Sequence, residues 1–260
     1  MDPIEYIIIA LLQGLAEWLP ISSEGQLMLF LNFASSINPY EAFVLVIWLH
    51  VGTAASVVAR YPKEILNILT LNNRLDFKLL LIATIATAIS GIPMYLFFES
   101  FINNAQGEFL NLLIGVLLII TGIILAISSK RMFENKSVDS KIMFITGLMQ
   151  GFAILPGISR SGVTVATLLL QKIEKETALK YSFLMSIPAI LGAFFFENLK
   201  SGFVLPGEPV FLGIAELVAF IVGFITMTAL LRIAKTIDFS KFCIFMGLIA
   251  VLIYPLSIIF

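Results

Sequence analysis

Cysteine, histidine and charged residues are all scarce in this sequence. Cys243 is the only cysteine and His50 the only histidine among 260 residues. A single cysteine excludes an internal disulfide and any metal cluster held by cysteines. Only 13% of the residues are charged, whereas 59% are hydrophobic. This composition excludes an ordinary soluble domain and is typical of a polytopic membrane protein.

The first ten residues also lack a basic side chain. They read MDPIEYIIIA, with Asp2 and Glu5 at the edge of the apolar run. A secretory signal peptide needs a positively charged start, so we expect no cleavable signal here. The net charge of −1 says nothing in itself about partners, and no nucleic acid is expected among them.

Long apolar runs mark the expected membrane crossings. Four runs with little or no charge are long enough to span a bilayer, namely 79–98, 109–129, 209–231 and 242–260. Two shorter runs, 42–59 and 181–196, are bounded by charges or turn residues and can span if the helix tilts or the bilayer thins. The sequence therefore predicts an all-α membrane protein with six transmembrane helices.

Two further apolar regions, 4–34 and 142–171, do not fit this scheme. Pro, Gly, Ser and single charges interrupt both of them. Irregular backbone at membrane depth is tolerated where it lines a cavity. We interpret both regions as re-entrant helix–loop–helix hairpins.

The basic residues indicate the orientation. If six crossings are correct, 14 of the 16 Lys and Arg residues fall on one side of the membrane, in four loops. These residues are Arg60, Lys63, Arg74 and Lys78 in the first loop, Lys130, Arg131, Lys136 and Lys141 in the second, Lys172, Lys175 and Lys180 in the third, and Arg232, Lys235 and Lys241 in the fourth. The opposite loops, 99–108 and 197–208, hold only Lys200. The positive-inside rule places the basic loops in the cytoplasm. Arg160 belongs to no loop.

The two interrupted regions resemble each other. LLQGLAEWLPISSEGQL (11–27) aligns with LMQGFAILPGISRSGVTV (148–165), at an offset of about 137 residues. The chain then reads as one membrane domain of two repeats, about 1–130 and 141–260. Each repeat has an odd number of crossings, so the two repeats are inverted and their hairpin tips can meet near the midplane.

Polar residues gather at the two predicted tips. The first tip carries Glu17, Ser22, Ser23, Glu24 and Gln26, and the second carries Ser159, Arg160, Ser161 and Thr164. Small residues such as Gly157 and Gly162 let backbone N–H groups approach an anion, and the helix that starts near Gly162 directs its positive end toward it. A guanidinium adds a fork that matches phosphate oxygens. The tips therefore predict a phosphate pocket at membrane depth.

Simpler interpretations stand beside this one. Arg160 could merely pair with Glu17 and hold the hairpins together, and single hydroxyls in membrane helices commonly bond to backbone. His50 in VIWLHVGTAA is either a packing residue or an acid–base or nucleophilic group that faces the same pocket. Glu216 has no evident partner in the repeat.

Two segments resemble the signature segments of the undecaprenyl-pyrophosphate phosphatase family, also called the bacitracin-resistance family. The first, GLAEWLPISSEGQ with Gln13 before it, follows the pattern of Gln or Glu, three residues, Glu, and later Pro-x-Ser-Ser-x-Gly-His, except at the final histidine. The second, LPGISRSGVTV, follows Pro-Gly-x-Ser-Arg-Ser-x-x-Thr in full. The length and order of segments also agree over essentially the whole chain.

This resemblance implies six crossings, two re-entrant hairpins and hydrolysis of a polyprenyl diphosphate to its monophosphate. It implies a divalent cation, Mg²⁺ or Ca²⁺, and a phosphate site that opens to the outer face. The expected partners are the lipid substrate and the bilayer, and a homodimer is left open. One departure is that Gln26 stands where the family has a histidine, so either that histidine is auxiliary, His50 supplies an imidazole, or the activity is altered.

Each candidate residue then has an expected role. Glu17, Ser23, His50 and Arg160 are the catalytic candidates, with Ser23 as nucleophile activated by Glu17 or His50, or water attacking directly. Glu17 and Gln13 are expected to hold the cation. The phosphate-binding candidates are Ser22, Gln26, Gly157, Ser159, Arg160, Ser161 and Thr164. The rival hypothesis is a flippase for the same lipid phosphate, because inverted repeats are also typical of transporters.

Overall fold

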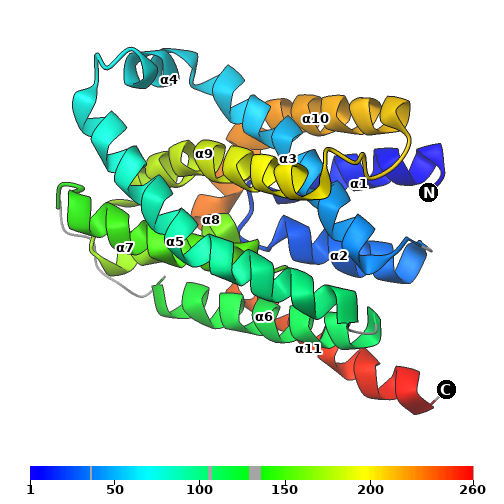
Figure 1. Cartoon of the computed structure of the whole chain (residues 1–260). Helices are drawn as coiled ribbons and strands as arrows, with labels where there is room; N and C mark the ends of the chain where they lie inside the picture. The colour runs from blue at the N-terminus through cyan, green and yellow to red at the C-terminus, as the bar shows by residue number, and fades with distance from the viewer. Residues whose placement is uncertain (36, 105–106, 129–135, 260) are drawn as a thin grey trace.

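The computed structural model describes residues 1–35, 37–104, 107–128 and 136–259 (Figure 1). Within these ranges the chain forms eleven α-helices and one short 3₁₀ helix, and no strand. In order these are α1 (Pro3–Ala16), α2 (Ser23–Ala34), α3 (Pro39–Arg60), α4 (Pro62–Leu69), α5 (Arg74–Asn104), α6 (Gly107–Ser128), α7 (Ser140–Gly151), η1 (Phe152–Ile154), α8 (Arg160–Leu170), α9 (Lys175–Ser201), α10 (Pro209–Thr236) and α11 (Ser240–Ile259). The predicted all-α class is confirmed.

Six helices coincide with the six expected crossings: α3, α5, α6, α9, α10 and α11. In the described part of the chain, the first five are long and apolar enough to cross a membrane. In α11 the described apolar stretch, Ser240–Ile253, is shorter. The chain is therefore a multi-pass membrane protein.

Several helices extend past the predicted limits, because a charge ends an apolar run without ending a helix. α5 begins at Arg74 rather than 79 and has Asp76 in its first turn, where a carboxylate suits the helix dipole. α9 covers Lys175–Ser201 instead of 181–196. The sequence also gave no indication of α4, which begins directly at Pro62 after α3 ends.

Each interrupted region folds into two helices joined by a short turn. α1 and α2 form the first pair, and α7 and α8, with η1 between them, form the second. Serine caps both returning helices: Ser22 Oγ accepts a hydrogen bond from the Gly25 N–H (3.3 Å), and Ser159 Oγ accepts one from the Gly162 N–H (3.1 Å). These caps satisfy N–H groups that the helix itself leaves free.

The first helix of each pair packs against the other half of the chain. α1 lies beside α10, and α7 lies beside α5 (Figure 1). Glycines permit the close approach: a Cβ on Gly14 would lie 2.8 Å from the Cβ of Val222. Where α6 crosses α11, a Cβ on Gly115 would lie 2.8 Å from the carbonyl oxygen of Gly247. Small residues at helix contacts are typical of membrane proteins.

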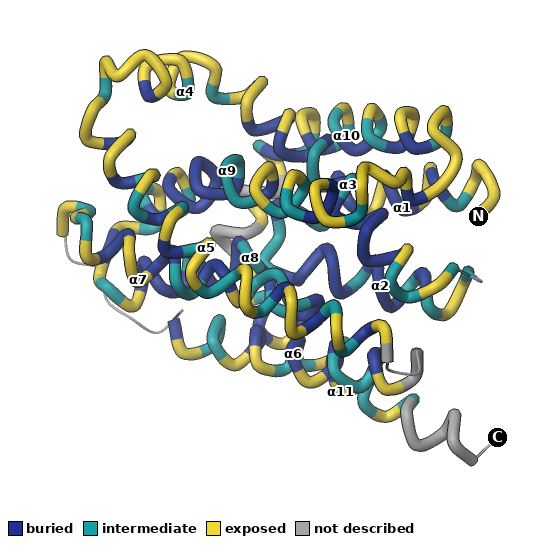
Figure 2. Tube along the Cα trace, viewed as in Figure 1, coloured by how far each residue is buried: buried dark blue, intermediate teal, exposed yellow. Residues whose placement is uncertain are grey.

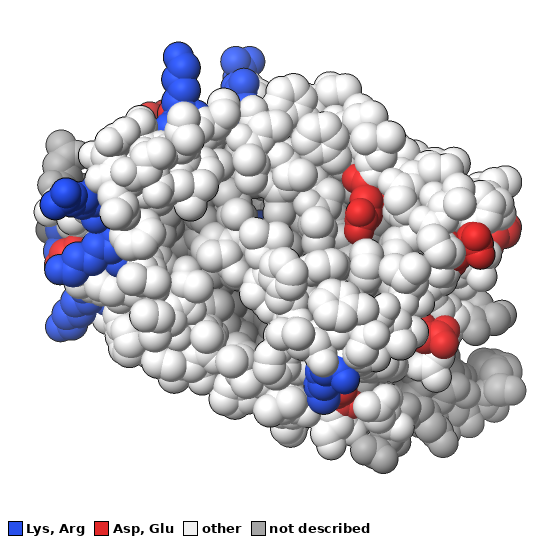
Figure 3. Space-filling model, turned by 45° about the horizontal axis from the view of Figure 1, so that its top comes forward, with Lys and Arg blue, Asp and Glu red and all other residues white. Residues whose placement is uncertain are grey.

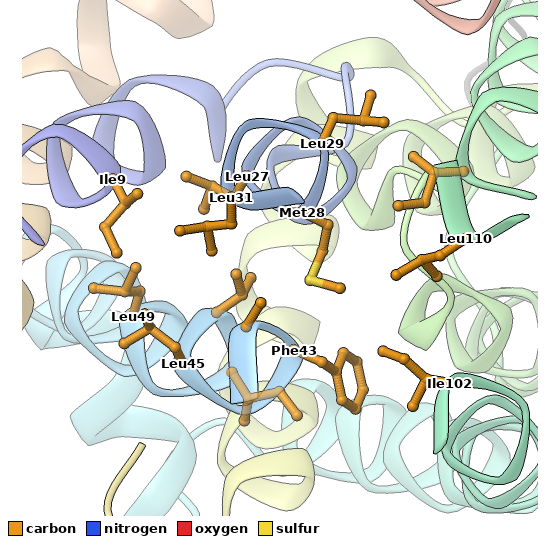
Figure 4. Close-up of a cluster of buried hydrophobic side chains, with 14 of the residues drawn as sticks. Ile9, Leu27, Met28, Leu29, Leu31, Phe43, Leu45, Leu49, Ile102 and Leu110 are labelled. Atoms are coloured by element: carbon orange, nitrogen blue, oxygen red, sulfur yellow. The ribbon is translucent and has the colours of Figure 1, made fainter. Parts of the chain in front are cut away.

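The largest apolar core surrounds α2. Its buried side chains, among them Leu27, Met28 and Leu31, meet Ile9 of α1 and Phe43 of α3 (Figure 4). Buried residues lie toward the interior of the bundle, and exposed ones follow its outer faces (Figure 2). α2 is therefore held inside the protein, which fixes the residues at its first turn.

Charged side chains separate along the molecule. On the face shown in Figure 3, most Lys and Arg side chains gather at one end, and Asp and Glu side chains lie mainly toward the other. Lys130 and Arg131, which belong to the predicted basic loops, lie outside the described residues. At the acidic end Lys200 forms an ion pair with Glu99.

Candidate active site

The turns of the two helix pairs are in direct contact. Ser22 Oγ also accepts a hydrogen bond from the N–H of Gly157 (3.0 Å), so one hydroxyl caps α2 and binds the opposite turn. Gly157 has φ +106°, which only glycine adopts readily. The two turns also approach closely, since a Cβ on Gly25 would lie 2.8 Å from the backbone nitrogen of Gly157. Thr121 Oγ1 donates to the Gly157 carbonyl (2.8 Å) and accepts from the Ser159 N–H (3.2 Å).

The back of the first turn is held by the second half of the chain. Trp18 Nε1 donates to the carbonyl of Gly223 (3.0 Å). The buried thiol of Cys243 lies 3.3 Å from the carbonyl oxygen of Pro20. Contacts on both sides thus fix the turn that presents Glu17 and Ser23.

Glu17 lies at the centre of the predicted constellation. Its Oε2 accepts hydrogen bonds from Ser23 Oγ (2.7 Å) and Gln13 Nε2 (3.1 Å), and it lies 3.2 Å from His50 Nε2. Its Oε1 forms an ion pair with Arg160 Nη2. Both carboxylate oxygens therefore have partners, as a buried charge requires. The structure brings all four predicted catalytic residues together.

His50 is fixed from both sides of its ring. Its Nδ1 lies 2.7 Å from the carbonyl oxygen of Val46, and its Nε2 faces Glu17. Both neighbours accept hydrogen bonds, and only an imidazolium donates from both nitrogens. In this arrangement His50 contributes positive charge beside Glu17, and the group placed to take the Ser23 proton is the Glu17 carboxylate.

The second turn contributes Arg160 and its neighbouring hydroxyls. Arg160 also donates from Nη1 to the carbonyl of Ser182 on α9 (3.2 Å). Ser159 Oγ lies 3.3 Å from Ser161 Oγ, which donates to the carbonyl of Leu19 (3.3 Å). Thr164 is fully buried and bonds to the Arg160 carbonyl (2.8 Å) and to Ser182 Oγ (2.7 Å). Thr164 thus supports the position of Arg160 from behind.

A small polar cavity of about 30 Å³ lies between the two turns. Its wall is formed by Glu17, Leu19, Ser22, Ser23, Glu24, His50, Ala153, Ile158, Ser159, Arg160 and Ser161. Arg160 and several hydroxyls thus face one small space and could bind an oxyanion, while Glu17 and Glu24 add carboxylates to the same wall.

Four predicted site residues lie outside this wall. Gly157 and Thr164 hold the turns from behind, and Gln13 bonds to Glu17 and, at 3.5 Å, to Thr53. Gln26 Nε2 donates to the carbonyl of Ile21 (3.3 Å), within its own turn. Among the described residues, the structure therefore brings Gln26 to the turn but not to the cavity.

A larger, mainly apolar cavity of about 240 Å³ adjoins the polar one. This cavity was not predicted from the sequence, although runs of small residues in α5 and α9 are a signal for such space. It lies among α3, α5, α7 and α9, with Ile47, Ala88, Gly91, Tyr95, Ala153, Pro188, Gly192 and Phe196 in its wall. Glu24, His50 and Arg160 line both cavities, so the two share one boundary.

The site offers oxygen atoms suited to a hard cation. Gln13 Oε1 and Glu24 Oε1 are buried and lack a hydrogen-bond partner. Carboxylate and amide oxygens are the ligands that Mg²⁺ and Ca²⁺ prefer. Among the described residues, no group of three His, Cys, Asp or Glu side chains gathers closely enough to form a metal site. A cation here would need oxygens from substrate or water as well, which is usual for Mg²⁺.

Gln26→Ala is expected to change activity little. The variant loses one neutral hydrogen bond to Ile21, which is worth about 1 kcal/mol of stability. We expect a slightly lower Tm and turnover within about threefold of the wild type. Purified variants compared by thermal unfolding and by phosphate release test this. A hundredfold loss of turnover at unchanged Tm would show that Gln26 reaches the substrate.

Fold and site together define a multi-pass helical membrane protein with a buried, charged polar site next to an apolar cavity. The chain belongs to the bacitracin resistance protein family, because the family model described as "Bacitracin resistance protein BacA" matches residues 6–252. It is 38% identical over 253 residues to an undecaprenyl-diphosphatase of Methanothrix thermoacetophila, with 96% of each chain covered. It is 35% identical over 260 residues to an undecaprenyl-diphosphatase of Haloarcula marismortui, covering 95% of this chain and 96% of that one. A further undecaprenyl-diphosphatase, of Methanopyrus kandleri, is 37% identical over 260 residues, with 96% and 95% covered.

Proposed function

We propose that this protein is a membrane phosphatase that hydrolyses undecaprenyl or a similar polyprenyl diphosphate to the monophosphate and phosphate. The observation that carries the proposal is the contact of Ser23, Glu17 and Arg160 at a polar cavity that adjoins an apolar one. One cavity is polar and the other mainly apolar, as are the two ends of such a substrate. The activity would recycle the lipid carrier of cell-envelope glycan synthesis and give resistance to bacitracin. The names of the relatives support this function.

The proposed topology has six crossings and two re-entrant hairpins in an inverted repeat. Ser22 with Gly25, and Ser159 with Gly162, form the same cap at the predicted offset. α1 packs against α10 of the second half as α7 packs against α5 of the first. With the basic loops in the cytoplasm, the site opens to the outer side of the cell membrane.

The proposed reaction begins with binding of the terminal phosphate. Arg160 and the hydroxyls of Ser159 and Ser161 hold its oxygens, helped by the N-terminal end of α8. Ser23 Oγ attacks the terminal phosphorus while its proton passes to Glu17 Oε2, to which it is already hydrogen-bonded. The bond from phosphorus to the bridging oxygen breaks, and prenyl monophosphate leaves.

Water then releases phosphate from Ser23, and Glu17 returns the proton to the serine oxygen. The alternative is direct attack by a water that Glu17 activates, without a phosphoserine. Arg160 neutralises charge on the transferred group in both routes. A divalent cation, for which Glu17 and Gln13 are the predicted ligands, would add further neutralisation of the diphosphate when bound.

The prenyl tail is placed in the apolar cavity. Gly192 lines this cavity, and a Cβ added there meets no atom within 4 Å. Gly192→Leu therefore meets no clash at its Cβ and adds apolar bulk at the wall of the tail space. We expect KM for a long polyprenyl diphosphate to rise about tenfold, because roughly 1.5 kcal/mol of apolar contact is displaced.

Gly213→Leu is the matched control for this change. Gly213 also has open space around its Cβ, but it lies on α10 and does not line the cavity. Steady-state kinetics with long and short prenyl diphosphates compare the two variants. If Gly192→Leu and the wild type have equal KM values for the long substrate, the tail does not bind in this cavity.

The proposed function is tested by phosphate release from pure protein in detergent. Micelles have no sidedness, so a flippase has nothing to transport, whereas a phosphatase still releases phosphate. Prenyl diphosphates of several lengths define the preferred carrier. The flippase is the less favoured candidate, because the relatives carry the name of a diphosphatase and Ser23 is already bonded to a carboxylate.

A further inference from the structure

Glu24 is the one carboxylate of the described cavity walls that has no hydrogen-bonding or ion-pair partner. It lies in the first turn of α2 and is 8% exposed. Its Oε1 is buried without a hydrogen-bond partner, in contrast to both oxygens of Glu17. The family pattern leaves the position between Ser23 and Gly25 unspecified, so Glu24 is not one of the residues that define the motif.

The position of Glu24 is informative because it lines both cavities. In the proposed function this boundary is where the diphosphate joins the prenyl tail. An ionised Glu24 would repel the diphosphate across this poorly screened space, and burial without a partner opposes its ionisation. Arg160 and His50 also line this boundary, but both are paired with Glu17, and neither forms an ion pair with Glu24.

A divalent cation between the carboxylate and the phosphate removes the conflict. Mg²⁺ is commonly held by one or two carboxylates together with substrate phosphate oxygens and water. One or two protein ligands are therefore sufficient to hold Mg²⁺ when phosphate and water supply the rest. This agrees with the described residues, in which no group of three His, Cys, Asp or Glu side chains is found.

We propose that Glu24 is a cation ligand of this site and bridges a divalent ion to the diphosphate at the boundary of the two cavities. This rests on the proposed function for the identity of the phosphate, but not for the binding of the cation. Glu24 then takes the place of Glu17 as the carboxylate ligand, while Glu17 keeps its contacts with His50 and Arg160 and remains the acceptor of the Ser23 proton.

The test is Mn²⁺ binding to the purified full-length protein in detergent, followed by the loss of the free-ion EPR signal. It is measured with Mn²⁺ alone and with inorganic phosphate present. Glu24→Gln keeps the shape of the side chain and removes the charge, and we expect it to raise the Kd for Mn²⁺ at least about tenfold. Glu24→Asp should retain part of the affinity.

Glu216→Gln is the matched control, since Glu216 is a carboxylate on α10 that lines neither cavity. Its Kd for Mn²⁺ should equal that of the wild type, and thermal unfolding confirms that each variant is folded. A Kd in Glu24→Gln within about twofold of the wild type overturns the inference. So does a wild type that binds no Mn²⁺ under either condition.

The outcomes separate this inference from the proposed function. If Mn²⁺ binding depends on Glu24 but no phosphate is released from any prenyl diphosphate, the cation site stands and the phosphatase does not. If the wild type releases phosphate and Glu24→Gln binds Mn²⁺ as well as the wild type does, the phosphatase stands. Glu24 would then act as a neutral hydrogen-bond donor to phosphate, and the cation site falls.

Discussion

Arg160→Ala is expected to lower phosphate release from a polyprenyl diphosphate on the order of 10³-fold or more. The variant loses the guanidinium that faces the polar cavity and neutralises the transferred phosphoryl group. It also leaves the buried Glu17 without its guanidinium partner, which costs about 3–5 kcal/mol of stability. Steady-state phosphate release and thermal unfolding measure the two effects.

A double variant separates chemistry from folding. Arg160→Ala combined with Glu17→Gln removes the unpaired charge, so the Tm should recover while activity stays absent. Arg160→Lys keeps the charge but not the planar fork and should recover only part of the activity. An Arg160→Ala protein with wild-type turnover would reduce Arg160 to a brace between the helix pairs.

Ser23→Ala is expected to reduce turnover by about 10³-fold or more while substrate affinity changes little. The oxygen that attacks phosphorus is lost, whereas Arg160, Ser159 and Ser161 remain to bind the phosphate. Ser56→Ala is the matched control, because Ser56 is a buried serine of α3 whose hydroxyl bonds only to the backbone of Gly52 and Phe220. It should retain the wild-type rate.

The same variant distinguishes the two routes of hydrolysis. With substrate labelled at the terminal phosphate, acid quench of the wild type should trap label on the protein, and Ser23→Ala should trap none. Rapid turnover without labelled protein, together with substantial activity in Ser23→Ala, would assign the attack to water.

The meeting of Glu17 and Arg160 could be predicted from the sequence because charge is so rare in it. Arg160 was the one basic residue outside any loop, and the internal similarity placed the Glu17 segment opposite it. At membrane depth an unpaired charge is costly, so few partners were available. The matching caps at Ser22 and Ser159 follow from the same similarity.

Other features depend on side-chain directions that a single sequence does not carry. Gln26 is adjacent to the polar residues in sequence, yet it turns back to the carbonyl of Ile21. Thr164 is the threonine of the second motif, but its hydroxyl bonds to Ser182 and does not face the polar cavity. The apolar cavity arises where small residues of separate helices happen to face one another, and the free oxygen of Glu24 is evident only once its neighbours are known.

The helix limits illustrate a further cause. Apolar runs locate the part of a helix that contacts lipid, while the hydrogen-bonded helix continues into charged residues such as Arg74 and Lys175. α4 was not predicted for a related reason: a short, exposed helix contains no long apolar run that would reveal it in the sequence.

The central claim is that the buried Ser23–Glu17–Arg160 group cleaves the anhydride bond of a prenyl diphosphate. The most direct test supplies purified wild-type protein and Arg160→Ala with substrate labelled on the terminal phosphate, in detergent with Mg²⁺, and identifies the labelled product. The account predicts inorganic phosphate from the wild type and none above background from the variant. Intact substrate after prolonged incubation with folded wild-type protein, or inorganic diphosphate as the labelled product, would contradict it.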